Sequence, residues 1–335
     1  MSDASEVRIG ITGTGGLGTH LGRGFGDVDG AAVVAVADVD EDNRASAAAE
    51  FGVPEGDRYG DHEAMLDGTD LDGVVVATPH TLHYDQVVAA LDQGIDTLCE
   101  KPLCTDLADA EDLVARAETG EAALMVGYQR HLDPTFRAVR DELPERVGEV
   151  DYLTAEITQD WISGQEGAWR SNPDLSGGGQ LYDTGSHLLD AVLWSTGLSP
   201  VAVDAQMQFH DAAERVDVQA ALTVEFANGA VASIAVSGDA ARHREHVHAW
   251  GESGGLYIDR AEWGRPDLQF VDRDGDSLAR HVTEYDHRSK PAAFVDVIRE
   301  GADPPATARD ALTVTAVTEA AYESARTGKT VEIDI

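Results

Sequence analysis

The 335-residue sequence contains very little lysine and cysteine. Only three lysines, Lys101, Lys290 and Lys329, occur among 24 basic residues, and 62 acidic residues bring the formal net charge to −38. A surface this acidic repels nucleic-acid phosphates and anionic membranes, which excludes both as partners. The two cysteines, Cys99 and Cys104, do not make a disulfide framework, and we expect both to pack as small apolar residues.

Long hydrophobic runs are also missing. No segment approaches the ~20 apolar residues of a membrane span, and the opening "MSDASEVRIG" lacks the apolar core of a signal peptide, so we expect a cytoplasmic protein. Abundant Asp and Glu with little Lys is typical of a halophilic protein. Near molar salt the electrostatic screening length falls to about 3 Å, so the acidic side chains on the surface hardly repel one another. The alternative is an acidic protein of an ordinary cell. Apolar periodicity runs along the whole chain, which predicts a folded protein of two domains.

The first segment with a chemical signature is "VRIGITGTGGLGTHLGRGF", which predicts a strand over 7–12, a glycine turn and a helix. Its glycines fit G-x-G-x-x-G, in which they allow a tight turn, close approach of a pyrophosphate, and close packing of helix on strand. The amides and the dipole at the helix start favour the phosphate charge. The predicted phosphate-binding turn consists of Gly13, Gly15, Gly16, Leu17 and Gly18.

A second buried-strand pattern, "AAVVAVADVD", brings Asp38 to a position 20 residues after Gly18. An acidic side chain there can accept hydrogen bonds from the adenosine ribose and repel a 2′-phosphate, so NAD is predicted and NADP is less favoured. The acidic run at 40–42 adds to this repulsion. Arg44 is the opposing signal, since an arginine could accept the extra phosphate, although it could equally stack on adenine or lie in solvent.

Three more strand-like runs follow at 73–78, 96–100 and 123–128, and helical patterns at 83–94 and 106–119 separate them. This alternation predicts an α/β domain with a doubly wound parallel sheet. Ligands of such sheets bind beyond the carboxyl ends of the strands. The residues expected to face the cofactor there are Thr78, Pro79, His80, Glu100, Lys101 and Pro102.

From about residue 148 the pattern changes to the alternation of strands with one wet face, at 149–161, 216–229, 230–238 and 243–251. The Asn-Gly in "FANGAV" predicts a hairpin. The predicted domains are therefore 1–127 and 128–335.

Between these strands, "SGGGQLYDTGSHLLDAVLWSTG" predicts a helix that begins around residues 182–184. Asp183 and His187 are four residues apart and share one helix face. The plainer interpretation is an Asp near a helix N-terminus and a packed histidine.

The segments "GITGTGGLG", "VVVATPHTLHYDQVVAALDQGIDTLCEKPL", "VGYQRHLDP", "GGGQLYDTGSHLLDAVLWSTG" and "GKTVEI" together resemble the Gfo/Idh/MocA oxidoreductase family. The resemblance covers nearly the whole chain. It implies an N-terminal Rossmann domain with a doubly wound parallel sheet, and a C-terminal α+β domain with an open, mostly antiparallel sheet. It further implies a small-molecule sugar, inositol or polyol substrate and a homo-oligomer, either a dimer or a tetramer.

The resemblance also implies roles for particular residues. Lys101 of "EKP" would be catalytic, with a Lys–Pro bond that is often cis, and Asp183 and His187 would be the family's Asp-x-x-x-His pair. His80 departs from the asparagine of many relatives. The predicted cofactor contacts then also include Thr78, Pro79, His83, Glu100, Lys101, Gln129, Trp169, Arg170 and Tyr285.

Oxidation of a secondary alcohol by NAD needs a base for the hydroxyl proton and a group that stabilises alkoxide character. Histidine has an unperturbed pKa near 6.5, so His187 is the predicted base. Lys101 would donate hydrogen bonds to the substrate oxygen and the nicotinamide ribose, and Asp183 would bind a neighbouring hydroxyl or orient His187. The predicted function is an NAD-dependent dehydrogenase. The alternatives are a glycosidase that retains NAD and oxidises transiently, and a non-catalytic NAD-sensing protein. No metal is predicted, because His246 and His248 lack a third ligand.

Overall fold

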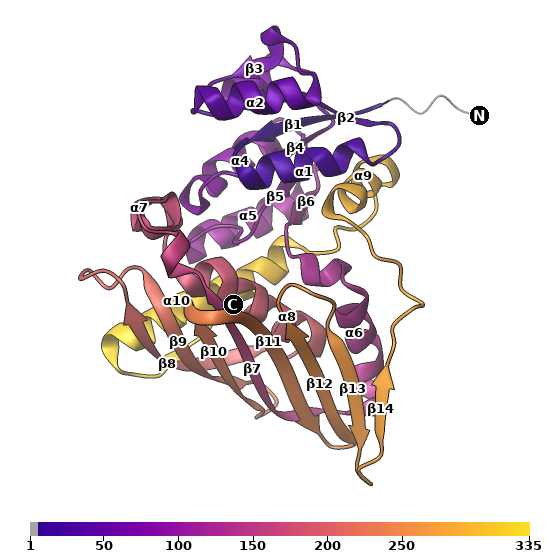
Figure 1. Ribbon diagram of the computed structural model, residues 1–335, viewed down its shortest axis with the longest axis vertical. Coiled ribbons are helices and arrows are strands. Elements are labelled where there is room, and N and C mark those ends of the chain that lie inside the picture. Colours follow the sequence, from indigo (N-terminus) through magenta and orange to yellow (C-terminus); the bar gives the residue numbers. More distant parts are fainter. Residues whose placement is uncertain (1–5) are drawn as a thin grey trace. The chain divides into compact units, whose positions relative to one another are not determined.

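A computed structural model of the chain describes residues 6–335. The chain forms two compact units, each built on one sheet (Figure 1). The first unit consists of the chain up to Gln129 together with Arg288–Leu312, and the second of Arg130–His287 together with Thr313–Ile335. These units describe compactness rather than sequence domains, so the boundary between residues 127 and 128 stays a prediction.

The sheet of the first unit has six parallel strands in the order β3-β2-β1-β4-β5-β6. Most of their side chains are buried and apolar, as is typical of a sheet covered by helices on both faces. The predicted doubly wound parallel sheet is confirmed. Its strands are β1 (Val7–Thr12), β2 (Ala31–Ala37), β3 (Arg58–Tyr59), β4 (Gly73–Val76), β5 (Asp96–Cys99) and β6 (Leu124–Val126).

Helices cover both faces of this sheet. On one face α1 (Gly16–Gly26) lies beside α2 (Glu41–Phe51) and α9 (Lys290–Glu300), while on the other α4 (His83–Asp92) lies beside α5 (Leu107–Thr119) (Figure 1). Helix α3 (His62–Gly68) also contacts α4. Helix α9 thus brings a late part of the sequence back to the first unit. The rings of Phe25 and Phe294 hold it there in an edge-to-face contact at 6.4 Å.

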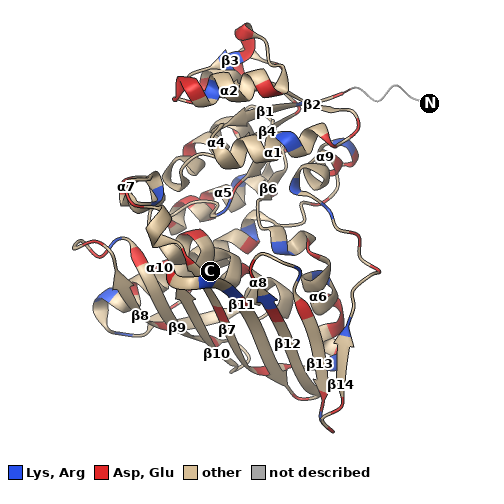
Figure 2. Ribbon diagram, in the orientation of Figure 1, with Lys and Arg blue, Asp and Glu red and all other residues tan. Residues whose placement is uncertain are grey.

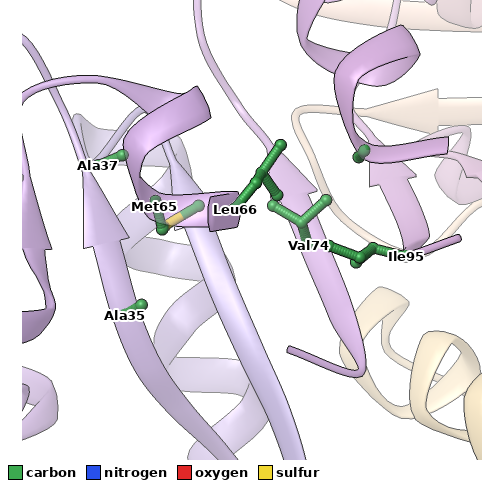
Figure 3. Close-up of a cluster of buried hydrophobic side chains, with 7 residues drawn as sticks. Ala35, Ala37, Met65, Leu66, Val74 and Ile95 are labelled. Carbon is green, nitrogen blue, oxygen red and sulfur yellow. The ribbon is translucent and has the colours of Figure 1, made fainter. Parts of the chain in front are cut away.

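A cluster of buried side chains fixes α3 on the sheet (Figure 3). Small residues on β2, Ala35 and Ala37, leave room for Met65 of α3, which is fully buried. Val74 of β4 and Ile95, just before β5, continue the same layer. The neighbouring strands β1, β4 and β5 pair in parallel, so their carboxyl ends lie at one edge of the sheet.

The sheet of the second unit has nine strands in the order β14-β13-β12-β11-β7-β10-β9-β8-β15. Only β7 and β10 pair in parallel, which confirms the mostly antiparallel sheet. The predicted hairpin is present, with Gly229 at φ +88° between β9 and β10. The strands are β7 (Val150–Asp160), β8 (Pro200–Phe209), β9 (Asp217–Phe226), β10 (Val231–Ser237), β11 (Asp239–Gly251), β12 (Gly254–Ala261), β13 (Asp267–Asp272), β14 (Ser277–Arg280) and β15 (Val331–Glu332).

Helices pack on one face of this sheet. Helix α6 (Pro134–Arg146) lies on β12 and β13, and α8 (Ser186–Thr196) lies beside α6 and on β7. The short α7 (Pro173–Ser176) precedes α8, and the later part of α10 (Ala308–Thr327) reaches β8, where Ser324 Oγ accepts a hydrogen bond from the Ala205 amide. Along β7, β9 and β11, buried residues alternate with half-buried or exposed ones. The second face of the sheet is therefore partly open to solvent, as the sequence predicts.

Acidic side chains lie mainly on the helices and loops, whereas the strands of both sheets are mostly uncharged (Figure 2). The negative charge therefore lies mostly outside the sheets and their apolar cores. Within residues 6–335, no helix has the length and hydropathy that a membrane crossing requires.

Candidate active site

The glycine turn between β1 and α1 has two kinds of glycine. Gly13 lies at φ +84°, and a Cβ there would come within 2.6 Å of the Ala77 carbonyl carbon. A Cβ on Gly18 would lie 1.9 Å from the Gly13 carbonyl oxygen. These two positions are glycine because the protein's own backbone fills the space. A Cβ on Gly15 or Gly16, in contrast, would meet no protein atom within 4 Å.

The open side of this turn fits a dinucleotide phosphate. Helix α1 begins at Gly16 with Gly15 as its N-cap, and no side chain caps it. Its first amides are therefore left for an anion, and the helix dipole favours one. Leu17 is half-buried in the first turn.

Asp38 lies directly after β2 and bonds to the glycine turn. Its Oδ2 accepts hydrogen bonds from the Thr14 amide (2.7 Å) and the Thr14 hydroxyl (3.1 Å), and its Oδ1 accepts one from the Asp40 amide (2.9 Å). A carboxylate has about four acceptor positions, so Oδ1 retains capacity for a ribose hydroxyl. Arg44 donates through Nη1 to the Asp38 carbonyl oxygen at 2.5 Å. Asp38, which disfavours NADP, and Arg44, which could bind its 2′-phosphate, are therefore in contact.

The ends of β4 and β5 are joined by His83. Its Nδ1 lies 2.8 Å from the Pro102 carbonyl oxygen, and its Nε2 lies 2.9 Å from that of Thr78. Burial lowers the pKa of His83, although both carbonyl acceptors favour the protonated ring. The peptide bond between Lys101 and Pro102 is cis, as the resemblance implies. The buried ring of His83 therefore fixes the backbone directly after Lys101.

The other predicted contacts of the first unit lie around these strand ends. Thr78 donates through Oγ1 to Gln86 Oε1 at 2.8 Å, and Pro79 is half-buried beside it. Glu100 is buried and forms an ion pair with Lys290. Gln129 is exposed at the start of a 3₁₀ turn. Sequence reasoning missed Lys290, which lies 190 residues from its partner.

In the second unit, Asp183 and His187 lie on one continuous helical segment. The segment starts at Leu181 with a π-helical turn, Leu181–Gly185, and continues as α8, so the predicted start at 182–184 is one to three residues late. Both side chains are buried, with exposed fractions of 8% for Asp183 and 9% for His187. Such π turns are often found at functional sites.

Two donors hold the Asp183 carboxylate. Its Oδ2 accepts hydrogen bonds from Trp161 Nε1 (2.8 Å) and Arg170 Nε (3.0 Å). Arg170 also lies over the ring of Trp169, 4.4 Å from its centroid. Arg170, one of the predicted cofactor contacts, therefore lies between Asp183 and the ring of Trp169. Trp161, which is not among the predicted site residues, is a donor to the same oxygen.

A buried Asp–Tyr pair supports the turn before Asp183. Asp217 Oδ1 accepts hydrogen bonds from the Gly179 amide (3.1 Å) and the Tyr322 hydroxyl, and its Oδ2 accepts one from the Leu181 amide (2.9 Å). A Cβ on Gly179 would lie 2.0 Å from the Asp217 carbonyl oxygen, which explains a glycine there. Burial raises the pKa of Asp217 to about 6, and its hydrogen bonds offset part of this effect.

Two predicted features take other places. The Tyr285 hydroxyl donates to Asp141, and the Arg137 guanidinium lies 5.0 Å from its ring centroid, so the side chain is engaged on α6. Its role at the cofactor stays a prediction. His248 Nε2 lies 3.1 Å from Asp259 Oδ1, and within the described residues no group of three or more His, Cys, Asp or Glu could hold a metal ion.

Comparison with known proteins identifies both halves of the chain. The model described as "Oxidoreductase family, NAD-binding Rossmann fold" matches residues 7–128, and that of the "GFO/IDH/MocA C-terminal domain" matches residues 136–257. D-xylose 1-dehydrogenase (NADP(+)) 2 of Haloferax volcanii is 27% identical over 333 residues, covering 98% of this chain and 100% of the relative. D-apiose dehydrogenase of Paraburkholderia graminis is 28% identical over 338 residues, covering 94% and 86%.

A solved structure agrees over the full length. The aldose–aldose oxidoreductase from Caulobacter crescentus, complexed with glycerol, superposes with a TM-score of 0.84 at 25% identity, covering 98% of this chain and 100% of that one.

The raised pKa of Asp217 predicts a pH-dependent stability. A carboxyl whose folded pKa lies above its unfolded value stabilises the fold below the unfolded pKa, and this contribution is lost as the pH rises through about 6. Asp217→Asn should therefore gain stability relative to the wild type by up to about 3 kcal/mol between pH 4 and 7.5. Urea unfolding at constant KCl measures this difference. Asp204→Asn, an exposed position on β8, is the control, and a difference that does not change with pH contradicts the assignment.

Proposed function

The chain belongs to the Gfo/Idh/MocA family of NAD(P)-dependent oxidoreductases that act on CH–OH groups of sugars and polyols, and from this premise we propose that it is an NAD-dependent dehydrogenase of an aldose. The observation that carries the proposal is the glycine turn. Its open side at Gly15 and Gly16 admits a pyrophosphate, and Asp38 lies beside it with acceptor capacity for a ribose. The names of the xylose and apiose relatives support an aldose as the substrate class.

The proposed chemistry divides between the two units. When bound, the nicotinamide supplies the hydride acceptor. Lys101 donates to the alcohol oxygen and stabilises the negative charge that develops there. His187 accepts the hydroxyl proton, and Asp183, held by Trp161 and Arg170, binds a neighbouring hydroxyl. This assignment requires Lys101 and His187 to act on the same substrate carbon.

NAD is proposed over NADP because of the charge around the end of β2. The carboxylate of Asp38 faces the turn, and the next helix starts with Asp40, Glu41 and Asp42. A 2′-phosphate there would meet several negative charges within a few ångströms. The opposing observations are Arg44, which lies against the Asp38 backbone, and the NADP(+) in the name of the Haloferax relative.

The function is tested with a panel of aldoses, inositols and polyols in molar KCl, with formation of NADH or NADPH followed by absorbance. At least one aldose should give stoichiometric reduced cofactor. Lys101→Met should lower kcat by about 10²-fold or more while NADH still binds, because the reacting oxygen loses its donor whereas the glycine turn and Asp38 remain to hold the cofactor.

Lys329→Met, at an exposed lysine, is the charge-matched control and should keep full activity. A Lys101→Met enzyme with near-normal turnover would overturn the role of Lys101. Release of a glycosidic product without net NADH would instead support the NAD-retaining glycosidase.

The cofactor preference is tested with Asp38→Asn, which keeps the shape of the side chain and removes its charge. The ratio of kcat/KM for NAD to that for NADP should fall by about tenfold or more, because the repulsion of the 2′-phosphate is lost. Glu111→Gln removes an exposed charge from α5 and should leave the ratio unchanged. A wild-type enzyme that prefers NADP would refute the proposal directly.

Adaptation to high salt is proposed from the net charge of −38, and the haloarchaeal source of the full-length xylose dehydrogenase relative supports it. The melting temperature should rise by about 10 °C or more between 0.1 and 2 M KCl, since the screening length falls from about 10 Å to about 3 Å or less. Thermal unfolding followed by circular dichroism measures this shift. A melting temperature that is independent of KCl would contradict the proposal.

A further inference from the structure

Lys290 and Glu100 form a buried ion pair in the first unit. The Lys290 ammonium contacts Glu100 Oε1, and it also lies 3.4 Å from the Gly127 carbonyl oxygen. The side chains are only 12% and 3% exposed. Glu100 is the residue directly before Lys101, so two of the three lysines of the chain meet at the same short motif.

The position of Lys290 in its own helix does not explain a lysine. It is the first residue of α9, where a cation opposes the helix dipole. Ser289 already caps this helix, because its Oγ accepts a hydrogen bond from the Ala292 amide at 3.2 Å. Lys290 is also not a surface residue that serves hydration, because its side chain is mostly buried and the chain has only three lysines in all. The contact that remains as a reason is the one with Glu100.

The Glu100 carboxylate has little room to move. A Cβ on Gly127 would lie 2.8 Å from Glu100 Oε2, so the carboxylate packs directly on the backbone that follows β6. The Glu100 amide bonds to the Val76 carbonyl at 2.9 Å, which fixes its backbone to β4. A carboxylate this buried is costly without a cation beside it.

Helix α9 supplies that cation from a fixed position. The ring of Pro291 packs against α1, where a Cβ on Gly24 would come within 2.8 Å of it. One turn later, Phe294 contacts Phe25. The backbone of Lys290 is therefore anchored to α1. If its ammonium is removed, the ammonium adjacent to Glu100 in sequence is that of Lys101.

We propose that Lys290 is a positioning residue for Lys101: it neutralises and holds the Glu100 carboxylate, so that this carboxylate does not draw the ammonium of Lys101 away from the reacting oxygen. This inference rests on the proposed dehydrogenase function, in which Lys101 touches the substrate. Without Lys290, Glu100 pairs with Lys101 and withdraws its charge from the reaction. The effect of losing Lys290 should then depend on the charge of Glu100.

The test is a double-mutant cycle with Lys290→Met and Glu100→Gln. Lys290→Met should lower kcat by about tenfold or more when Glu100 is present, and by less than about twofold in the Glu100→Gln background, because no carboxylate remains to pair with Lys101. The NADH dissociation constant, measured by fluorescence, should change by less than about threefold in Lys290→Met. Lys329→Met again controls for the loss of one lysine.

An equal loss of kcat in both backgrounds would overturn the proposal, as would a loss that NADH affinity follows in parallel, since both point to a general structural role. A crystal structure of Lys290→Met gives a readout that needs no turnover. The Lys101 ammonium should have moved into contact with the Glu100 carboxylate, and an unmoved Lys101 side chain would refute the idea. If the wild-type enzyme reduces neither cofactor with any sugar, the proposed function fails, and this crystal structure alone decides the role of Lys290.

Discussion

A parallel sheet leaves a row of backbone groups at the carboxyl ends of its strands, and each of them needs a partner other than the next strand. In the first unit, side chains from distant parts of the sequence supply these partners. Asp38 bonds to the Thr14 amide, His83 bridges the carbonyls of Thr78 and Pro102, and Lys290 approaches that of Gly127. The same edge is where a dinucleotide binds in such folds. Side chains that close the strand ends therefore lie at the edge of the sheet where such folds bind their cofactor.

The second unit solves a similar problem with buried carboxylates. The Asp217 carboxylate accepts hydrogen bonds from the amides of Gly179 and Leu181, where the π turn begins. Asp183, within that turn, receives the side chains of Trp161 and Arg170. One aspartate fixes the backbone, and the carboxylate of the second is held by two side chains. The glycines of "SGGGQ" follow from this arrangement, because the backbone of Asp217 passes too close to Gly179 for any side chain.

Sequence patterns predicted those parts that depend on local periodicity. The apolar runs located the strands of the first unit except the two-residue β3, and the spacing of Gly13 and Gly18 reported backbone contacts that the structure contains. Helix α2 escaped prediction, because only Ala47 and Ala48 are buried and no apolar stripe marks it. The partners of the motif residues escaped for a different reason. Lys290 lies 190 residues from Glu100, and Tyr322 lies 105 from Asp217. No periodicity connects such pairs, since only the topology of the chain brings them together.

Scarcity of a residue type is a further signal, and the three lysines show how far it extends. In an acidic chain that uses arginine for most of its cations, a lysine is retained where a compact ammonium fits and a wide planar guanidinium does not. Lys101 satisfies this by sequence context, because it follows a buried strand. Lys290 satisfies it only through its burial between a carboxylate and a carbonyl, and its neighbours in sequence contain no such signal. Lys329 is equally rare but exposed. Rarity therefore selects the candidates, and burial against an acidic partner distinguishes a lysine with a defined task from one that merely lies in solvent.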